Sequence, residues 1–80
     1  MKATILVRYK KEVPDHAGSV LHERLHTLGY TEVKTAALGK LIELEIESAD
    51  RGNAQERVRQ IASQILANQL TEEFEILSLD

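Results

Sequence analysis

The spacing of apolar residues switches between two and three-to-four along this chain, and that switch constrains the fold more than any other feature. From residue 42 to residue 47, apolar and acidic side chains alternate strictly. Such a period of two predicts a β-strand with one apolar and one charged face. From Ala17 to Leu28, apolar residues instead recur at steps of four, four and three, the stripe of an amphipathic helix. The chain is therefore expected to mix strands and helices.

The same periodicity divides the chain into six elements with no repeat or linker. They are a strand over 2–9, a helix over 16–28, a hairpin of two strands over 33–47 that turns near 38–40, a helix over 54–68, and a strand over 74–79. Asp15 and Asn53 are the expected N-caps, and Gly29 the expected C-terminal cap. The order βαββαβ predicts an α+β, ferredoxin-like split β-α-β fold, with a four-stranded antiparallel sheet and two helices on one face.

Length and charge narrow the possible roles. The 80 residues fit a single domain, residues 1–80, whose core is small enough to favour a homo-oligomer, a dimer or a higher even assembly. A net charge of −3 without a basic patch argues against nucleic-acid binding. No cysteine is present, and the N-terminal apolar run is too short for a signal peptide or a membrane span. We therefore expect a cytoplasmic protein with no membrane contact.

One motif with catalytic precedent stands on the first predicted helix. His22, Glu23 and His26 match H-E-x-x-H, in which two histidines bind zinc and the glutamate polarises water. A catalytic zinc also needs a third protein ligand and a substrate cleft, which a chain of this size rarely provides. The two histidines are therefore interpreted as flanking the apolar stripe on its solvent side, with no metal site.

The other groups of polar residues give weaker indications of a catalytic or binding site. The three glutamates of the alternating segment are best explained as one solvated or partner-facing strand face. No phosphate-binding glycine loop is present, and no nucleophile with an acid–base partner can be identified. We expect no catalytic residue and no cofactor bound by this chain. A stand-alone ligand-sensing domain of the same fold remains an alternative.

Four short stretches carry a resemblance to a known family. They are Lys10-Lys11-x-Val13-x-Asp15-x-x-Gly18, Leu28-Gly29-Tyr30-x-x-Val33, Gly39-Lys40-x-Ile42-x-Leu44, and Leu66-Ala67-Asn68 followed by Glu72 and Phe74. In order and spacing they resemble the PurS family, the small subunit of phosphoribosylformylglycinamidine synthase, through nearly the whole chain. Departures occur at His16, Ala37 and Gln69, where the family usually has proline, arginine and proline.

The resemblance implies a non-catalytic subunit of a purine-biosynthesis complex. Such a subunit, as a homodimer, bridges a large synthetase subunit and a glutaminase subunit in an amidation that uses ATP, Mg²⁺ and glutamine, and is thought to help the ammonia pass. The residues that the resemblance marks as candidate subunit contacts are Asp15, Gly18, Tyr30, Gly39, Lys40 and Asn68.

Overall fold

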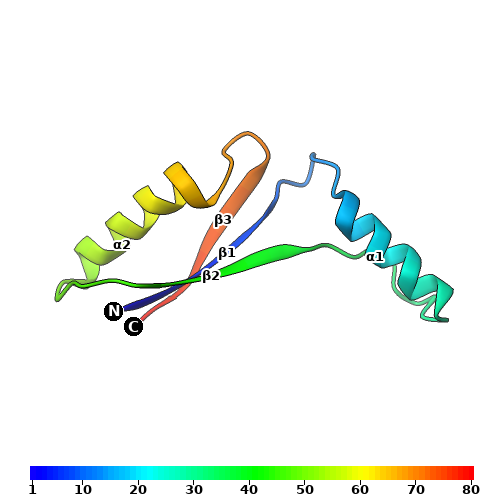
Figure 1. The fold of residues 1–80 in the computed structure, drawn as a ribbon, viewed down its shortest axis with the longest axis horizontal. Coiled ribbons are helices and arrows are strands. Elements are labelled where there is room, and N and C mark those ends of the chain that lie inside the picture. Colours follow the sequence, from blue (N-terminus) through cyan, green and yellow to red (C-terminus); the bar gives the residue numbers. More distant parts are fainter.

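The computed structural model describes residues 1–80 and has an α+β architecture (Figure 1). Its elements are β1 (Lys2–Tyr9), α1 (His16–Thr27), β2 (Gly39–Glu45), α2 (Arg51–Ile61), the π-helical turn η1 (Ala62–Leu66) and β3 (Glu72–Leu79). The mixed class and the first strand are confirmed as predicted from periodicity. None of the helices is long and apolar enough to cross a membrane.

The sheet has three antiparallel strands in the order β2-β1-β3, so the prediction of four strands is wrong. Ile5 of the central strand pairs with Ile42 on one side and Ile76 on the other. The missing strand is the predicted segment 33–37, which forms no ladder. The Val33 carbonyl of this segment contacts two histidine side chains of α1, and the amide of Leu38 just after it donates to the N-cap Asp15, so the segment lies along a helix and not in a sheet.

The hydrophobic core lies between one face of the sheet and α2. Ala3, Ile5 and Val7 of β1 are fully buried, because alternate residues of a strand point to the same face. Ala54 and Val58, one turn apart on α2, are fully buried against them. No residue of α1 belongs to this core.

Residues 10–38 form an extension, here called the arm, that leaves the sheet at one end (Figure 1). Arg8 pairs with Gly39, so the arm departs from and returns to adjacent strands at nearly the same point. The prediction that both helices lie on one face is therefore wrong, because α1 lies in the arm. The Cα radius of gyration is 15.9 Å, against about 12 Å for a compact chain of this length.

The N-cap of the first helix was predicted correctly from the sequence, and that of the second was not. Asp15 caps α1 and Gly29 follows it at φ 99°, both as predicted. The second helix begins three residues before its predicted start, because Asp50 rather than Asn53 is its N-cap and accepts from the Gly52 amide at 2.9 Å. Regular α-helix ends at Ile61 and continues as the π-helical turn, not to Asn68.

Candidate functional site

The predicted contact residues are not scattered: five of the six lie along the junction between the arm and the sheet. A chain of contacts runs from Asp15 to Leu38, continues through Gly39 to Lys40, crosses to Glu72 and ends at Asn68. Gly18 sits beside Asp15, one turn into α1. Tyr30 alone lies elsewhere, just beyond α1 and with its side chain exposed. The structure therefore groups Asp15, Gly18, Gly39, Lys40 and Asn68.

Asp15 links the two ends of the arm. One carboxylate oxygen accepts from the Gly18 amide at 2.8 Å, and the other accepts from the Leu38 amide at 3.1 Å. These two backbone N–H groups stabilise the ionised form and hold the pKa of Asp15 below its ordinary value. The same side chain thus begins α1 and ties the start of β2 to it.

Gly18 permits the close packing of the arm's two halves. A β-carbon at this position would lie 2.6 Å from the carbonyl oxygen of Ala36, which is shorter than a non-bonded contact allows. Gly18 is also the one fully buried residue of α1. Its role in this chain is therefore to let the segment that returns from α1 lie against the helix.

Gly39 and Lys40 begin β2 rather than turn a hairpin. Gly39 has no positive φ, so the prediction of a tight turn there is wrong. Its missing side chain matters for another reason, since a β-carbon would lie 2.9 Å from the carbonyl oxygen of Val7. The Lys40 ammonium reaches across the sheet to the Glu72 carboxylate at 3.7 Å.

Asn68 organises the turn before β3. Its carbonyl accepts from the amides of Thr71 and Glu72, and its side-chain oxygen accepts from the Leu70 amide at 3.0 Å. The backbone N–H of Asn68 donates to the Glu72 carboxylate at 2.8 Å. Asn68 and Lys40 therefore meet on the same glutamate, which ties this turn to β2.

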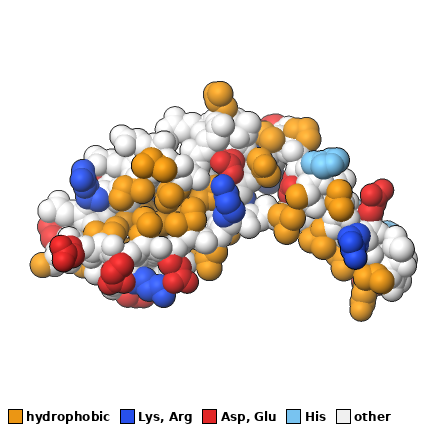
Figure 2. Space-filling model, in the orientation of Figure 1, with side chains coloured by type: hydrophobic (Ala, Val, Ile, Leu, Met, Phe, Trp, Pro, Cys, Tyr) orange, Lys and Arg blue, Asp and Glu red, His pale blue; other side chains and the backbone are white.

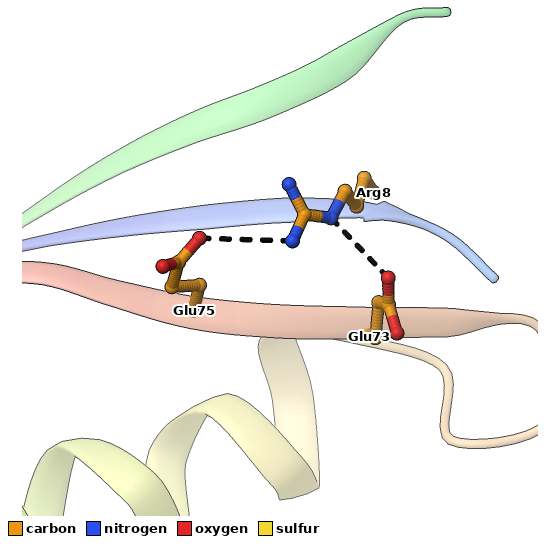
Figure 3. Close-up of polar contacts among 3 residues, drawn as sticks. All are labelled: Arg8, Glu73 and Glu75. Carbon is orange, nitrogen blue, oxygen red and sulfur yellow. Dashed lines mark hydrogen bonds and ion pairs between the residues drawn. The ribbon is translucent and has the colours of Figure 1, made fainter.

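Sequence reasoning missed one charged cluster near the junction, on the sheet face opposite α2. The guanidinium of Arg8 contacts Glu73 at 3.2 Å and Glu75 at 3.6 Å (Figure 3). All three side chains are about half exposed, so the cluster contributes little to stability. The period-two pattern of both strands would have placed these residues on one face, but only their register brings them together.

His22 and His26 are oriented by the arm. Their Nε2 atoms lie 3.0 and 3.1 Å from one acceptor, the carbonyl oxygen of Val33. No group of three or more His, Cys, Asp or Glu side chains is placed to hold a metal ion. His26 is exposed, as predicted, and His22 is partly buried, but both rings contact the returning segment and hold it against α1.

Apolar side chains remain uncovered on both parts of the molecule. Ile42, Leu44 and Ile46 are only half buried at the margin of the core, and Figure 2 shows a patch of hydrophobic side chains on the surface between α2 and the strands. On the arm, Leu28 and Tyr30 expose 69% and 52% of their surface. Uncovered apolar surface of this kind is typical of an interaction protein.

The polar groups of the junction hold backbone and form ion pairs; none forms a nucleophile with an acid–base partner. Shallow hollows of about 250 and 400 Å³ flank Leu38, lined on one side by Lys40 and Glu72 and on the other by Lys10 and Lys11. The first hollow is smaller than most ligand pockets, and the second is at the low end of their range.

Comparison with known proteins gives a consistent match. Residues 2–79 match the model of the PurS family, described as phosphoribosylformylglycinamidine (FGAM) synthase. The chain is 34% identical to phosphoribosylformylglycinamidine synthase subunit PurS of Bacillus subtilis over 91% of this chain and 86% of the relative. It is 36% identical to the subunit of the same name from Synechocystis over 95% of this chain and 78% of the relative.

Solved structures agree in fold over nearly the full length. The purS subunit of phosphoribosylformylglycinamidine synthase from Thermotoga maritima superposes with a TM-score of 0.88 at 33% identity, covering 98% of this chain and 90% of the other. A chain in the structure of PurLQS from the same organism gives a TM-score of 0.84 at 30% identity, covering 99% of both chains. The extended arm is thus part of a fold shared with these proteins.

Proposed function

This chain belongs to the PurS family of phosphoribosylformylglycinamidine synthase subunits, and from that premise we propose that it is an assembly subunit with no chemistry of its own. It joins a large synthetase subunit to a glutaminase subunit in the cytoplasm. ATP and Mg²⁺ are used by the large subunit, and this chain binds neither. The observation that carries the proposal is its likeness, over 99% of both chains, to a chain of the PurLQS structure.

The layout of side chains supports an assembly role. Asp15 has both carboxylate oxygens occupied by backbone amides, and His22 and His26 share one carbonyl. Groups engaged in this way orient the backbone of the arm. The stand-alone sensor considered from the sequence gains no support from the family match.

Self-association is the second part of the proposal. Only 9 of 80 residues are buried, and the core contains no residue of the arm, so in a single chain α1 packs against the returning segment but not against the sheet or α2. A helix of 12 residues is marginal in water unless its apolar face packs. The half-covered margin of the sheet at Ile42 and Leu44 offers such packing. We propose a homodimer in which the arm of one copy covers this margin of the other.

The assembly role is tested by nitrogen source. With both partner subunits, ATP and Mg²⁺, glutamine-dependent turnover should require this chain, whereas turnover with concentrated ammonia should persist without it. The contrast isolates delivery of ammonia from the synthetase chemistry. Glutamine-dependent turnover of equal rate without this chain would contradict the proposal.

The homodimer is tested separately by light scattering. Val20→Glu places a charge on the exposed side of the arm and should shift the population toward monomer. Leu70→Glu serves as the matched control, because Leu70 is 85% exposed in the turn before β3 and lies outside the arm. An unaltered chain that is monomeric at micromolar concentration would contradict the homodimer.

A further inference from the structure

A second surface lies at the β3 edge of the sheet, opposite the β2 edge, and is formed by α2 and β3. A hollow of about 380 Å³ lies between them. Its helical wall consists of Arg51, Gln55 and Arg59, and its other wall is the continuous stretch of residues 74–79. This surface is separate from the arm and from the junction described above.

Two guanidinium groups on this wall have no carboxylate partner. Arg51 and Arg59 make none of the ion pairs of the structure, whose cations are the N-terminus, Lys2, Arg8 and Lys40. Both arginines are exposed. They stand eight residues apart on α2, which corresponds to about 12 Å along the helix axis. The one carboxylate that lines the hollow, Glu75, is paired with Arg8, so the hollow presents two separated positive charges without a partner on a chain whose net charge is −3.

The strand beside them has an open edge. The strand order places β1 on one side of β3 and nothing on the other. No side chain bonds to the backbone of residues 73–79, and no backbone bond outside the ladder with β1 involves these residues. A free edge of this kind accepts an additional strand through main-chain hydrogen bonds.

The charge spacing and the strand edge select the same occupant. Residues four apart in an extended strand lie about 13 Å apart and point to the same face. A strand laid along β3 with carboxylates at such positions would bring one to each guanidinium. We propose that the α2–β3 hollow binds an extended acidic segment of a partner protein, carrying two carboxylates four residues apart. Within the proposed function, that partner is another subunit of the synthase complex.

The chemistry of the hollow is tested with the purified chain and labelled nine-residue peptides. One peptide carries glutamates at its third and seventh positions among threonine and valine; a control of identical composition carries them at the third and sixth. We expect fluorescence anisotropy to show the first binding about five- to tenfold more tightly, because only it can pair both charges on one face. Equal affinity for the two peptides would overturn the proposal.

Variants of the chain locate the binding. Arg51→Gln with Arg59→Gln should remove the preference between peptides. Arg57→Gln should leave it intact, because Arg57 lies outside the hollow and contacts Gln60. A loss of similar size with Arg57→Gln would indicate a general charge effect and overturn the assignment. Displacement of the peptide by inorganic phosphate at equal charge concentration would identify an anion site instead.

Strand addition is tested by N-methylation of the peptide. Methyl groups on one set of alternate residues face β3 and should abolish binding, while the other set should be tolerated. Tolerance of both sets would exclude edge pairing. Unchanged light scattering of the double variant is expected, and conversion of the dimer to monomer would identify a second copy as the occupant.

The occupant within the complex is tested with the two partner subunits. The double variant should assemble about five- to tenfold less tightly than the unaltered chain, and Arg57→Gln should assemble normally. Normal assembly of the double variant, alongside lost peptide preference, would overturn a synthase subunit as the occupant. Failure of the unaltered chain to assemble would contradict the proposed function itself, while the peptide measurements would still decide the chemistry of the hollow.

Discussion

Gly18 and Ala36 approach so closely that a β-carbon on Gly18 would lie 2.6 Å from the Ala36 carbonyl oxygen. Gly18→Ala should therefore push the returning segment away from α1. We expect a loss of about 1–3 kcal/mol in the free energy of unfolding, measured by urea denaturation.

Gly52→Ala provides the matched control for that substitution. Gly52 is also near the start of a helix, but a β-carbon there would meet only a flexible Asp50 oxygen at 3.4 Å. This change should be neutral or stabilising by up to about 1 kcal/mol, because alanine is the better helix former. Equal effects of the two substitutions would mean that contact with Ala36 is not the cause.

Because the pKa of Asp15 is lowered in the folded state, we expect the protein to lose stability in acid. Hydrogen bonds from Gly18 and Leu38 lower its pKa in the folded state, so its contribution is present above the ordinary value of 3.8 and is lost as pH falls through the lower folded-state pKa. Asp15→Asn removes this titration but leaves one acceptor. The difference in melting temperature between the two proteins should therefore be larger at pH 7 than at pH 3. A constant difference would show that ionisation of Asp15 does not matter.

The local parts of the fold were predictable because local chemistry determines them. Alternation of Ala3, Ile5 and Val7 defined β1, and the cap at Asp15 and the positive φ of Gly29 defined the ends of α1. These features depend on neighbours within a few residues. The candidate contact residues, by contrast, came from the family resemblance, and those that meet at the junction do so through contacts between distant residues, such as that of Lys40 with Glu72.

The missing strand and the position of α1 were not predictable in this way. Val33 alternates with polar neighbours as a strand would, yet its carbonyl is held by His22 and His26. A period of two reports which residues share a face but not which element covers that face. The path of residues 10–38 away from the sheet depends on contacts between distant residues, such as that of Asp15 with Leu38.

A side chain at Gly39 should disturb the pairing of β1 with β2, not a turn. A β-carbon at this position would lie 2.9 Å from the Val7 carbonyl oxygen, inside the pairing of β1 with β2. Gly39→Ala should cost about 1–3 kcal/mol, corresponding to a fall in melting temperature of roughly 4–8 °C per kcal/mol. Leu41→Ala, at an exposed position of the same strand, is the control and should cost less. An unchanged melting temperature for Gly39→Ala would show that the strands separate there without cost.

We expect His22 and His26 to have a structural role, and measuring the metal content can distinguish this role from a catalytic one. Each Nε2 lies within 3.1 Å of the Val33 carbonyl, and no third His, Cys, Asp or Glu completes a metal site. Protein purified without a histidine tag should therefore contain far less than one zinc per chain by elemental analysis. His26→Ala should instead increase hydrogen exchange at the amides of residues 33–38, because one of the two bonds that hold this segment is lost. Thr27→Ala, which removes a contact within α1 only, should leave exchange in that segment unchanged. One tightly held zinc per chain that disappears in His26→Ala would contradict this assignment and favour the hydrolase motif.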